Sequence, residues 1–141
     1  MAMITVDIVT AERTVFSDDA EVVVVPGIEG QMGILPHHIP LMTMLRPGEV
    51  LVRRGGEDTN LAISGGFLEV NSDRVIILVD AAEGAEEIDV KRAEVAKRRA
   101  EKELSQRAPG LDMAKTEAAL RRALARLAVV DKVKRGRKPG V

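Results

Sequence analysis

Residues 84–93 read Gly-Ala-Glu-Glu-Ile-Asp-Val-Lys-Arg-Ala and separate two kinds of sequence. Before this stretch, glycine and proline punctuate short runs rich in Val and Ile, a pattern typical of strands. After it the chain consists mainly of Ala, Arg, Glu, Lys and Leu, which favour helices. The sequence therefore predicts β plus α: a β-sandwich over residues 1–84, a helical hairpin over residues 85–134 and a basic flexible tail over residues 135–141.

The charge of the chain changes sign at the same stretch. Residues 1–84 contain 13 Asp or Glu, 5 Arg and no Lys, for a balance of −8. From residue 85 onward, 9 acids face 16 Lys or Arg, for a balance of +7. An acidic β-rich body thus carries a basic helical appendage, and we expect the function to depend on how the two parts relate.

Alternating apolar residues and frequent turn residues predict a sandwich of about ten strands. The main expected strands cover residues 4–8, 14–16, 21–25, 32–35, 41–45, 49–53, 59–64, 67–70 and 75–79. Ser17-Asp18-Asp19 is interpreted as a turn, and Arg54-Gly55-Gly56-Glu57 as a hairpin tip. The four valines at positions 22–25 suit a strand buried on both faces. The core must be aliphatic, because Phe16 and Phe67 are the only aromatic residues.

The helical part is predicted to be an antiparallel two-helix hairpin. Asp89 is the expected N-cap of the first helix, Pro109-Gly110 its end, and Asp112 the N-cap of the second helix. The apolar stripe of the first helix is Ala93, Ala96, Ala100 and Leu104. The stripe of the second is Leu120, Ala123, Leu124, Leu127 and Val130. Residues 132–138 are expected to be a frayed basic tail.

The first stripe consists mostly of alanine, which hides little apolar surface and therefore holds a hairpin only weakly. Alanine also keeps each helix intrinsically stable without its neighbours. This combination suits an element with two positions, although a close-packed static hairpin fits the pattern equally.

The sequence lacks the motifs of independent catalysis, namely a phosphate-binding loop, His-Glu-x-x-His or a serine with a histidine to serve it. His37 and His38 are adjacent, so their side chains diverge and do not share a metal. Ser64-Gly65-Gly66 is expected to be a bend or bulge rather than a phosphate nest. The absence of cysteine excludes disulfides and thiolate metal sites. A signal peptide and a membrane span are not expected.

Four arginines point to an anion site in the hairpin. Arg92 and Arg99 share one helix face, as do Arg122 and Arg126. Folding the hairpin about residue 109 brings the two pairs opposite each other, where arginine side chains favour bidentate phosphate contacts.

Two other readings of these basic residues remain open. The first is a solvated basic face in which Asp89 pairs with Arg92 and Glu103 pairs with Arg99. The second is a nucleic-acid adaptor that uses the hairpin and the tail. The scarcity of aromatic residues and the acidic body argue against nucleic acid as a partner.

Two motifs carry a family resemblance: Gly-Ile-Leu-Pro-His-His-Ile-Pro-Leu at residues 33–41 and Ser-Gly-Gly-Phe-Leu-Glu-Val at residues 64–70. With the basic hairpin they resemble the epsilon subunit of bacterial and chloroplast F-type ATP synthases. The resemblance implies a non-catalytic rotor subunit of a proton-translocating enzyme, peripheral at the cytoplasmic face of the bacterial plasma membrane. It implies a sandwich bound to the gamma subunit and the c-ring, and a hairpin that can extend toward the alpha and beta subunits and block ATP hydrolysis.

Residues 88–93 match the Ile/Leu-Asp-x-x-Arg-Ala motif of epsilon subunits that bind ATP, in which the nucleotide holds the hairpin down. The resemblance implies adenosine contacts from Glu83, Ile88, Asp89 and Ala93. It implies phosphate contacts from Arg92, Arg99, Arg122 and Arg126. Without an acid cluster suited to magnesium, we expect ATP to act as a regulatory ligand that is not hydrolysed. The alternative is a purely structural stalk subunit with a static hairpin and no nucleotide sensing.

The sequence departs from the family at two positions. The family usually has Gly where His37 stands, which implies a left-handed backbone there, and histidine tolerates that conformation better than most residues. An acid common before Gly-Ile-Leu-Pro is Gln31 here, and Glu29 can substitute for it. The resemblance implies that Glu29, Gln31 and His38 contact the c-ring.

Overall fold

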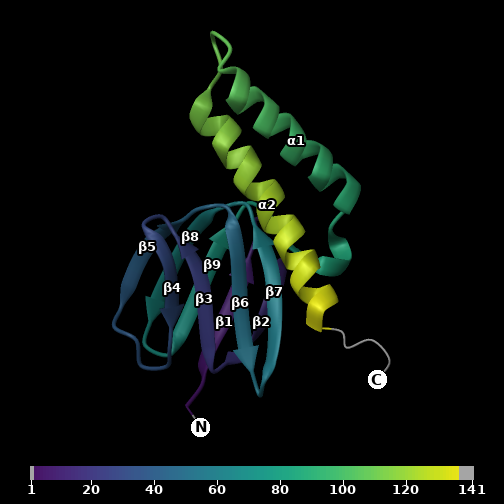
Figure 1. Cartoon of the computed structure of the whole chain (residues 1–141). Coiled ribbons are helices and arrows are strands. Elements are labelled where there is room, and N and C mark those ends of the chain that lie inside the picture. Colours follow the sequence, from purple (N-terminus) through teal and green to yellow (C-terminus); the bar gives the residue numbers. More distant parts are fainter. Residues whose placement is uncertain (1, 137–141) are drawn as a thin grey trace.

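Ten strands form one hydrogen-bonded sheet that folds over into a sandwich, with a pair of helices attached at one corner (Figure 1). The structure is a computed structural model and describes residues 2–136. The strands are β1 (Ile4–Val9), β2 (Thr14–Ala20), β3 (Val22–Gly27), β4 (Gly30–Ile34), β5 (Leu41–Leu45), β6 (Gly48–Arg54), β7 (Glu57–Ile63), β8 (Gly66–Asn71), β9 (Arg74–Val79) and β10 (Ala82–Gly84). The sandwich prediction is confirmed.

The strand order is β10-β7-β6-β3-β5-β8-β9-β1-β2, with β4 paired to β3. The β1–β9 pair is parallel and the other pairs are antiparallel. Residues of β3 pair with β4, with β6 and, at Gly27, with β5. This strand therefore joins the two runs of the sheet.

The core is aliphatic, as predicted. Its fully buried members include Ile4, Val6, Ile8, Val23, Val25, Ile34, Val50, Leu68, Val75 and Ile77. Phe16 packs at the margin of this core, and Phe67 is 51% exposed. The prediction that residues 22–25 are buried on both faces is wrong, because Val22 and Val24 are only half-buried and alternate with the buried valines.

The predicted turn at Ser17-Asp18-Asp19 is also wrong, because these residues continue β2. Their polar side chains bond across to β1: the Ser17 hydroxyl donates to Asp7 at 2.6 Å, and the Thr5 hydroxyl donates to Asp19 at 3.0 Å. β2 is an edge strand of the sheet, and its residues Asp18 and Asp19 are exposed to solvent rather than buried in the core. Charged residues on such an edge also discourage pairing with another chain.

The glycine turns follow the sequence prediction. Gly55 and Gly56 have φ values of 58° and 78° at the tip between β6 and β7. Ser64 and Gly65 form the bend that leads into β8 at Gly66. A Cβ at Gly66 would overlap the carbonyl oxygen of Leu78, so the close approach of β9 requires glycine there.

The helical part begins with a single 3₁₀ turn, η1 (Ala85–Glu87), and continues as α1 (Val90–Gln106) and α2 (Met113–Gly136). Both predicted caps are present: the Asp89 carboxylate accepts from the backbone N–H of Arg92 at 3.2 Å, and that of Asp112 from Lys115 at 3.1 Å. The two helices run antiparallel, and the loop between them points away from the sandwich (Figure 1).

The second helix is longer than predicted. The expected frayed tail at residues 132–138 is helical as far as Gly136, and residues 137–141 lie outside the described part. Two ion pairs support this last stretch: Lys132 with Glu49 of β6 at 3.0 Å, and Arg135 with Asp131 one turn earlier at 3.1 Å.

Only α2 packs directly and extensively on the sandwich, against β6 and β7, and α1 lies on its outer side (Figure 1). The contact is a small apolar group that we call the junction cluster: Ala62, Ile88, Ala125 and Val129. The placement of Leu124 in the apolar stripe is wrong, since this side chain is 43% exposed. The reason is that α2 packs on both α1 and the sandwich: Ala125 and Val129 are buried on the sandwich, and Ala123 is buried on another face of the helix.

Asp7 offers a test of the sheet. Its carboxylate lies in the β1 register opposite Ser17 and accepts from the Arg74 guanidinium at 2.8 Å. The Ser17 hydrogen bond, followed by the Arg74 bonds and charge, holds the pKa of Asp7 below its ordinary value despite burial. Since the unfolded pKa is about 3.9, this contribution to stability is present above about pH 4 and is lost as the pH falls through the folded pKa.

We predict that Asp7→Asn lowers the free energy of unfolding by about 1–3 kcal/mol at neutral pH, because a charged acceptor is lost. Urea denaturation at pH 7 and pH 3 measures this, with Asp80→Asn, an exposed carboxylate, as control. The Asp7→Asn deficit should shrink at pH 3. An equal loss at both pH values, or none at pH 7, contradicts the assignment.

Candidate functional site

A cavity of about 270 Å³ lies where the hairpin meets the sandwich, and we call it the junction pocket. It is lined by Glu83, Glu87, Asp89, Arg92, Ala93, Ala96 and Arg126. Five of these seven residues are among the eight for which the sequence predicted nucleotide contacts. The lining comes from β10 with the adjoining turn, from α1, which follows directly in the sequence, and from the distant α2, which contributes Arg126.

Local structure positions four of the five charged side chains of the junction pocket. Glu83 is fixed by pairing of β10 with β7, opposite Ala62. Asp89 and Arg92 stand at the start of α1, where the carboxylate of Asp89 caps the helix. Arg126 reaches from α2 and donates its Nε–H to Glu83 at 2.7 Å. Among residues 2–136, this ion pair is shorter than the other one that joins the helices to the sandwich, Lys132 with Glu49 at 3.0 Å.

Two other predicted contact residues lie beside the junction pocket rather than in it. Arg122 lines a narrow crevice of about 10 Å³ together with Glu83, Arg126 and the end of β7. Ile88 is 8% exposed and belongs to the junction cluster, where it packs under the hairpin. In this structure Ile88 therefore contributes to the apolar contact that holds α2 on the sandwich.

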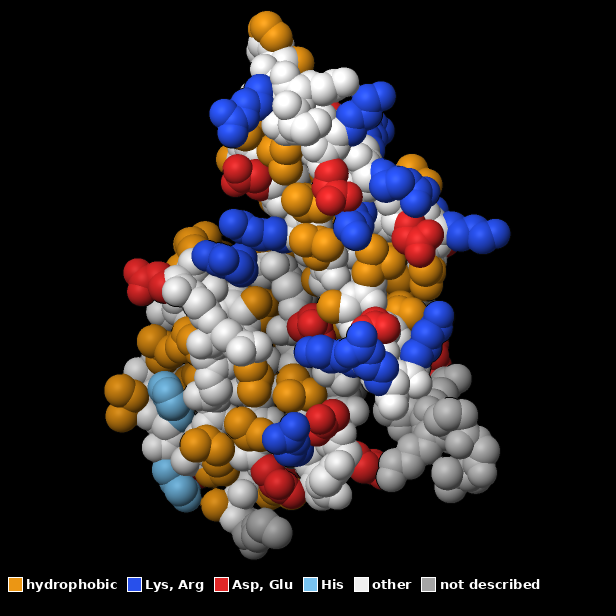
Figure 2. Space-filling view, viewed as in Figure 1, with side chains coloured by type: hydrophobic (Ala, Val, Ile, Leu, Met, Phe, Trp, Pro, Cys, Tyr) orange, Lys and Arg blue, Asp and Glu red, His pale blue; other side chains and the backbone are white. Residues whose placement is uncertain are grey.

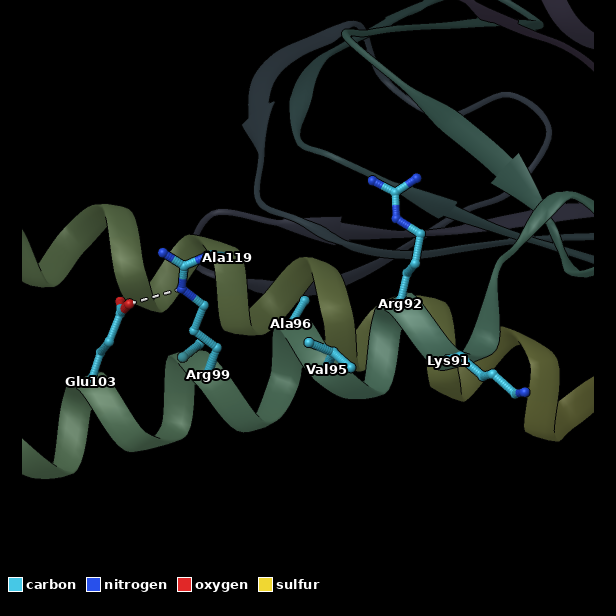
Figure 3. Close-up of a pocket in the computed structure, with 8 residues that line it drawn as sticks. Lys91, Arg92, Val95, Ala96, Arg99, Glu103 and Ala119 are labelled. Atoms are coloured by element: carbon cyan, nitrogen blue, oxygen red, sulfur yellow. Dashed lines mark hydrogen bonds and ion pairs between the residues drawn. The ribbon is translucent and has the colours of Figure 1, made fainter.

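Arg99 lines a second and larger cavity of about 490 Å³ on the hairpin, which we call the helix pocket (Figure 3). Its lining is Lys91, Arg92, Val95, Ala96, Arg99, Ala100, Glu103 and Ala119. Figure 3 shows Arg92 and Arg99 projecting to the same side of α1, with Arg99 bonded to Glu103. Arg92 borders both the helix pocket and the junction pocket.

The four arginines thus line three adjoining hollows rather than one groove. Arg92 and Arg126 share the junction pocket, Arg92 and Arg99 the helix pocket, and Arg122 and Arg126 the crevice. Of the local pairs in the solvated-face reading, Glu103 with Arg99 is present at 3.2 Å. Asp89 instead bonds the backbone of Arg92.

The arrangement is suited to holding an anion beside a small apolar surface. Within residues 2–136, Arg92 and Arg122 have no ion-pair partner, whereas Arg99 and Arg126 each have one carboxylate. Alanines at positions 93 and 96 leave room beside Arg92 for a flat or extended ligand. In the same described part, no group of three or more His, Asp or Glu is arranged to hold a metal ion.

The residues predicted to contact the c-ring fall into two groups. Glu29 and Gln31 line a shallow hollow at the turn between β3 and β4, and His38 lies beyond the other end of β4. His37 has a φ of 64°, so the predicted left-handed backbone is confirmed. The two histidines have separate partners: His37 bonds Asp73, and His38 bonds the carbonyl of Ile39.

Sequence reasoning missed an exposed apolar face on the sandwich. Met44, Phe67 and Leu78 are paired across β5, β8 and β9 and are each about half exposed. Met42, on the same face, is 70% exposed. Figure 2 shows hydrophobic side chains along the part of the sandwich that carries β4 and β5, and Lys and Arg over the hairpin. The sequence signal for this face was Phe67, one of only two aromatic residues, which directly follows the glycine pair Gly65-Gly66.

No helix within the described range has the length and apolar character required to cross a membrane.

Comparisons with known proteins give the same division of the chain. Residues 3–85 match the family described as the beta-sandwich domain of the ATP synthase delta/epsilon chain. Residues 86–131 match the long alpha-helix domain of the same chain.

Relatives match along nearly the whole length. The ATP synthase epsilon chain of Dehalococcoides mccartyi is 57% identical over 133 residues, covering 94% of this chain and 95% of the relative. That of Moorella thermoacetica is 52% identical, covering 90% and 96%. A chain in the mitochondrial ATP synthase of Euglena gracilis is similar with a TM-score of 0.78 at 27% identity, covering 91% of this chain and 81% of that one. This chain therefore belongs to the delta/epsilon family of F-type ATP synthases, as an epsilon subunit.

Proposed function

We propose that this chain is the rotor subunit of a proton-translocating ATP synthase that inhibits ATP hydrolysis through a movable helical hairpin. ATP is the regulatory ligand: it binds at the junction pocket and the adjoining arginines and holds the hairpin against the sandwich. The subunit is not catalytic itself, and it works at the cytoplasmic face of the bacterial plasma membrane as a peripheral part of the complex.

The observation that carries this proposal is the composition of the junction pocket. Arg92 of α1, Arg126 of α2 and Glu83 of the sandwich meet only while the helices lie side by side and α2 rests on β7. A ligand that contacts all three elements binds the stowed form better than an extended one. Such differential affinity is the only way in which a ligand can shift a two-state equilibrium.

The contacts that hold the hairpin are modest, as a movable element requires. In the junction cluster, only Ile88 and Val129 are large enough for burial to stabilise by about 1.5–3 kcal/mol each. The supporting ion pairs, Arg126 with Glu83 and Lys132 with Glu49, are partly exposed and so contribute little. A shift from 1:99 to 99:1 requires about 5.5 kcal/mol of differential binding, which several arginine–phosphate contacts can help to supply.

The sandwich offers two surfaces for the rest of the rotor. Its exposed apolar face around Met44 and Phe67 suits the gamma subunit, because an outward group of large apolar side chains marks a protein interface. The turn with Glu29 and Gln31, and the loop with His38, suit the c-ring. When extended, the basic hairpin is attracted to acidic surfaces of the alpha and beta subunits.

A static hairpin in a purely structural stalk subunit is the second candidate. It is favoured by the Lys132–Glu49 pair at 3.0 Å, which ties the last turns of α2 to β6. The Arg13–Glu87 pair at 3.1 Å fixes only η1, so it does not hold α1 or α2 in place.

We predict that Arg92→Ala weakens ATP binding to the isolated subunit about tenfold or more, because a charged phosphate donor is lost. The control is Arg98→Ala, which removes an exposed arginine that lines neither pocket. Isothermal titration calorimetry measures both. An unchanged affinity in Arg92→Ala, or an equal loss in the control, contradicts the nucleotide site.

We also predict that a subunit lacking residues 88–141 assembles into the complex and raises its ATPase activity severalfold at low ATP. The sandwich keeps its own core, and the inhibitory element is gone. Steady-state hydrolysis by complexes with full-length and truncated subunits measures the effect, with subunit content checked on gels. Normal assembly with unchanged activity supports the static alternative.

A further inference from the structure

Glu103 places a negative charge inside the helix pocket. It lies one helical turn after Arg99 and accepts the Arg99 Nε–H at 3.2 Å (Figure 3). The side chain of Glu103 is 38% exposed and that of Arg99 is 80% exposed. The carboxylate is thus more shielded than its partner, and the arginine side chain is largely open to solvent.

We propose that Glu103 is a built-in competitor of phosphate for Arg99 and thereby lowers the affinity of the subunit for ATP. The inference rests on the nucleotide site proposed above and concerns how that site is tuned. Carboxylate and phosphate oxygens are the same kind of acceptor for a guanidinium. A phosphate that takes the Nε–H of Arg99 must displace Glu103, and one that takes the terminal nitrogens of the guanidinium stays near the negative charge of Glu103.

The neighbouring residues sharpen this competition. The rest of the helix-pocket lining near Arg99 is apolar, namely Val95, Ala96, Ala100 and Ala119. Once displaced, the carboxylate, whose side chain is 38% exposed, is left to water and to the other cations of the same pocket, Arg92 and Lys91. Both are nearer the start of α1, so Glu103 has no equivalent bond to form there.

Glu83 has a similar relation to Arg126, at 2.7 Å, but it also ties the hairpin to the sandwich. Its removal changes both docking and binding. Glu103 and Arg99 belong to one helix, so their pair can be broken without touching the contact between α2 and the sheet. Glu103 is therefore the residue at which competition can be measured separately.

The test is calorimetric titration of ATP into the full chain with Glu103→Gln. Glutamine keeps the size of the side chain and removes its charge, so the dissociation constant should fall about two- to fourfold. Glu101→Gln is the matched control: it changes the net charge equally but lies about 160° away around the helix. Its affinity should stay within the error of the parent chain.

A second comparison uses Arg99→Ala. In that background Glu103→Gln should bring no gain, because the arginine for which it competes is absent. A gain of equal size there, or equal effects of the two glutamine variants, overturns the inference while leaving the nucleotide site intact. Lack of ATP binding by the parent chain overturns the proposed function itself.

Discussion

The contact of α2 with β6 and β7 is the interaction on which the rest of the architecture depends. Its buried part is small: two alanines, Ala62 and Ala125, together with Val129 and with Ile88 from the turn before α1. Small side chains let the helix approach the sheet closely, but they hide little apolar area, so the contact is specific in position and weak in energy. α1 has no extensive contact with the sandwich and is held mainly by its packing on α2. One weak interface thus decides where both helices lie.

The same contact organises the charges. The acidic body and the basic hairpin meet at ion pairs that join them, Arg126 with Glu83 and Lys132 with Glu49. These pairs neutralise part of the hairpin charge while it is stowed, and Arg92 and Arg122 stay without an ion-pair partner among residues 2–136. If the hairpin extends, the paired cations are released as well. On the proposed function, the stowed form therefore offers free arginines to an anionic ligand, and an extended form would offer its released cations to an acidic protein surface.

Much of this fold could be predicted from sequence, because its signals are local. Glycine turns and the Asp89 and Asp112 caps are decided within a few residues. The errors arose where residues distant in the sequence determine the secondary structure. Ser17 belongs to a strand and bonds Asp7 of the neighbouring strand, and Lys132 belongs to a helix and pairs with Glu49 of β6. Residues of the candidate site could be named from the resemblance and the helical spacing. The division of these residues among three hollows could not be predicted, because it depends on how the two helices cross and on which carboxylates the arginines contact.

The central claim is that bound nucleotide determines the position of the hairpin. The distance between a label on the sandwich and a label on α1 tests this claim most directly. The chain contains no cysteine, so spin labels can be placed on Asp80→Cys of the sandwich and Lys102→Cys of α1, both exposed positions. Pulsed electron–electron double resonance of the isolated subunit should give a single short distance with saturating ATP. Without ATP it should give, in addition, a population of molecules with a longer distance. Identical distance distributions in the two conditions would contradict the account.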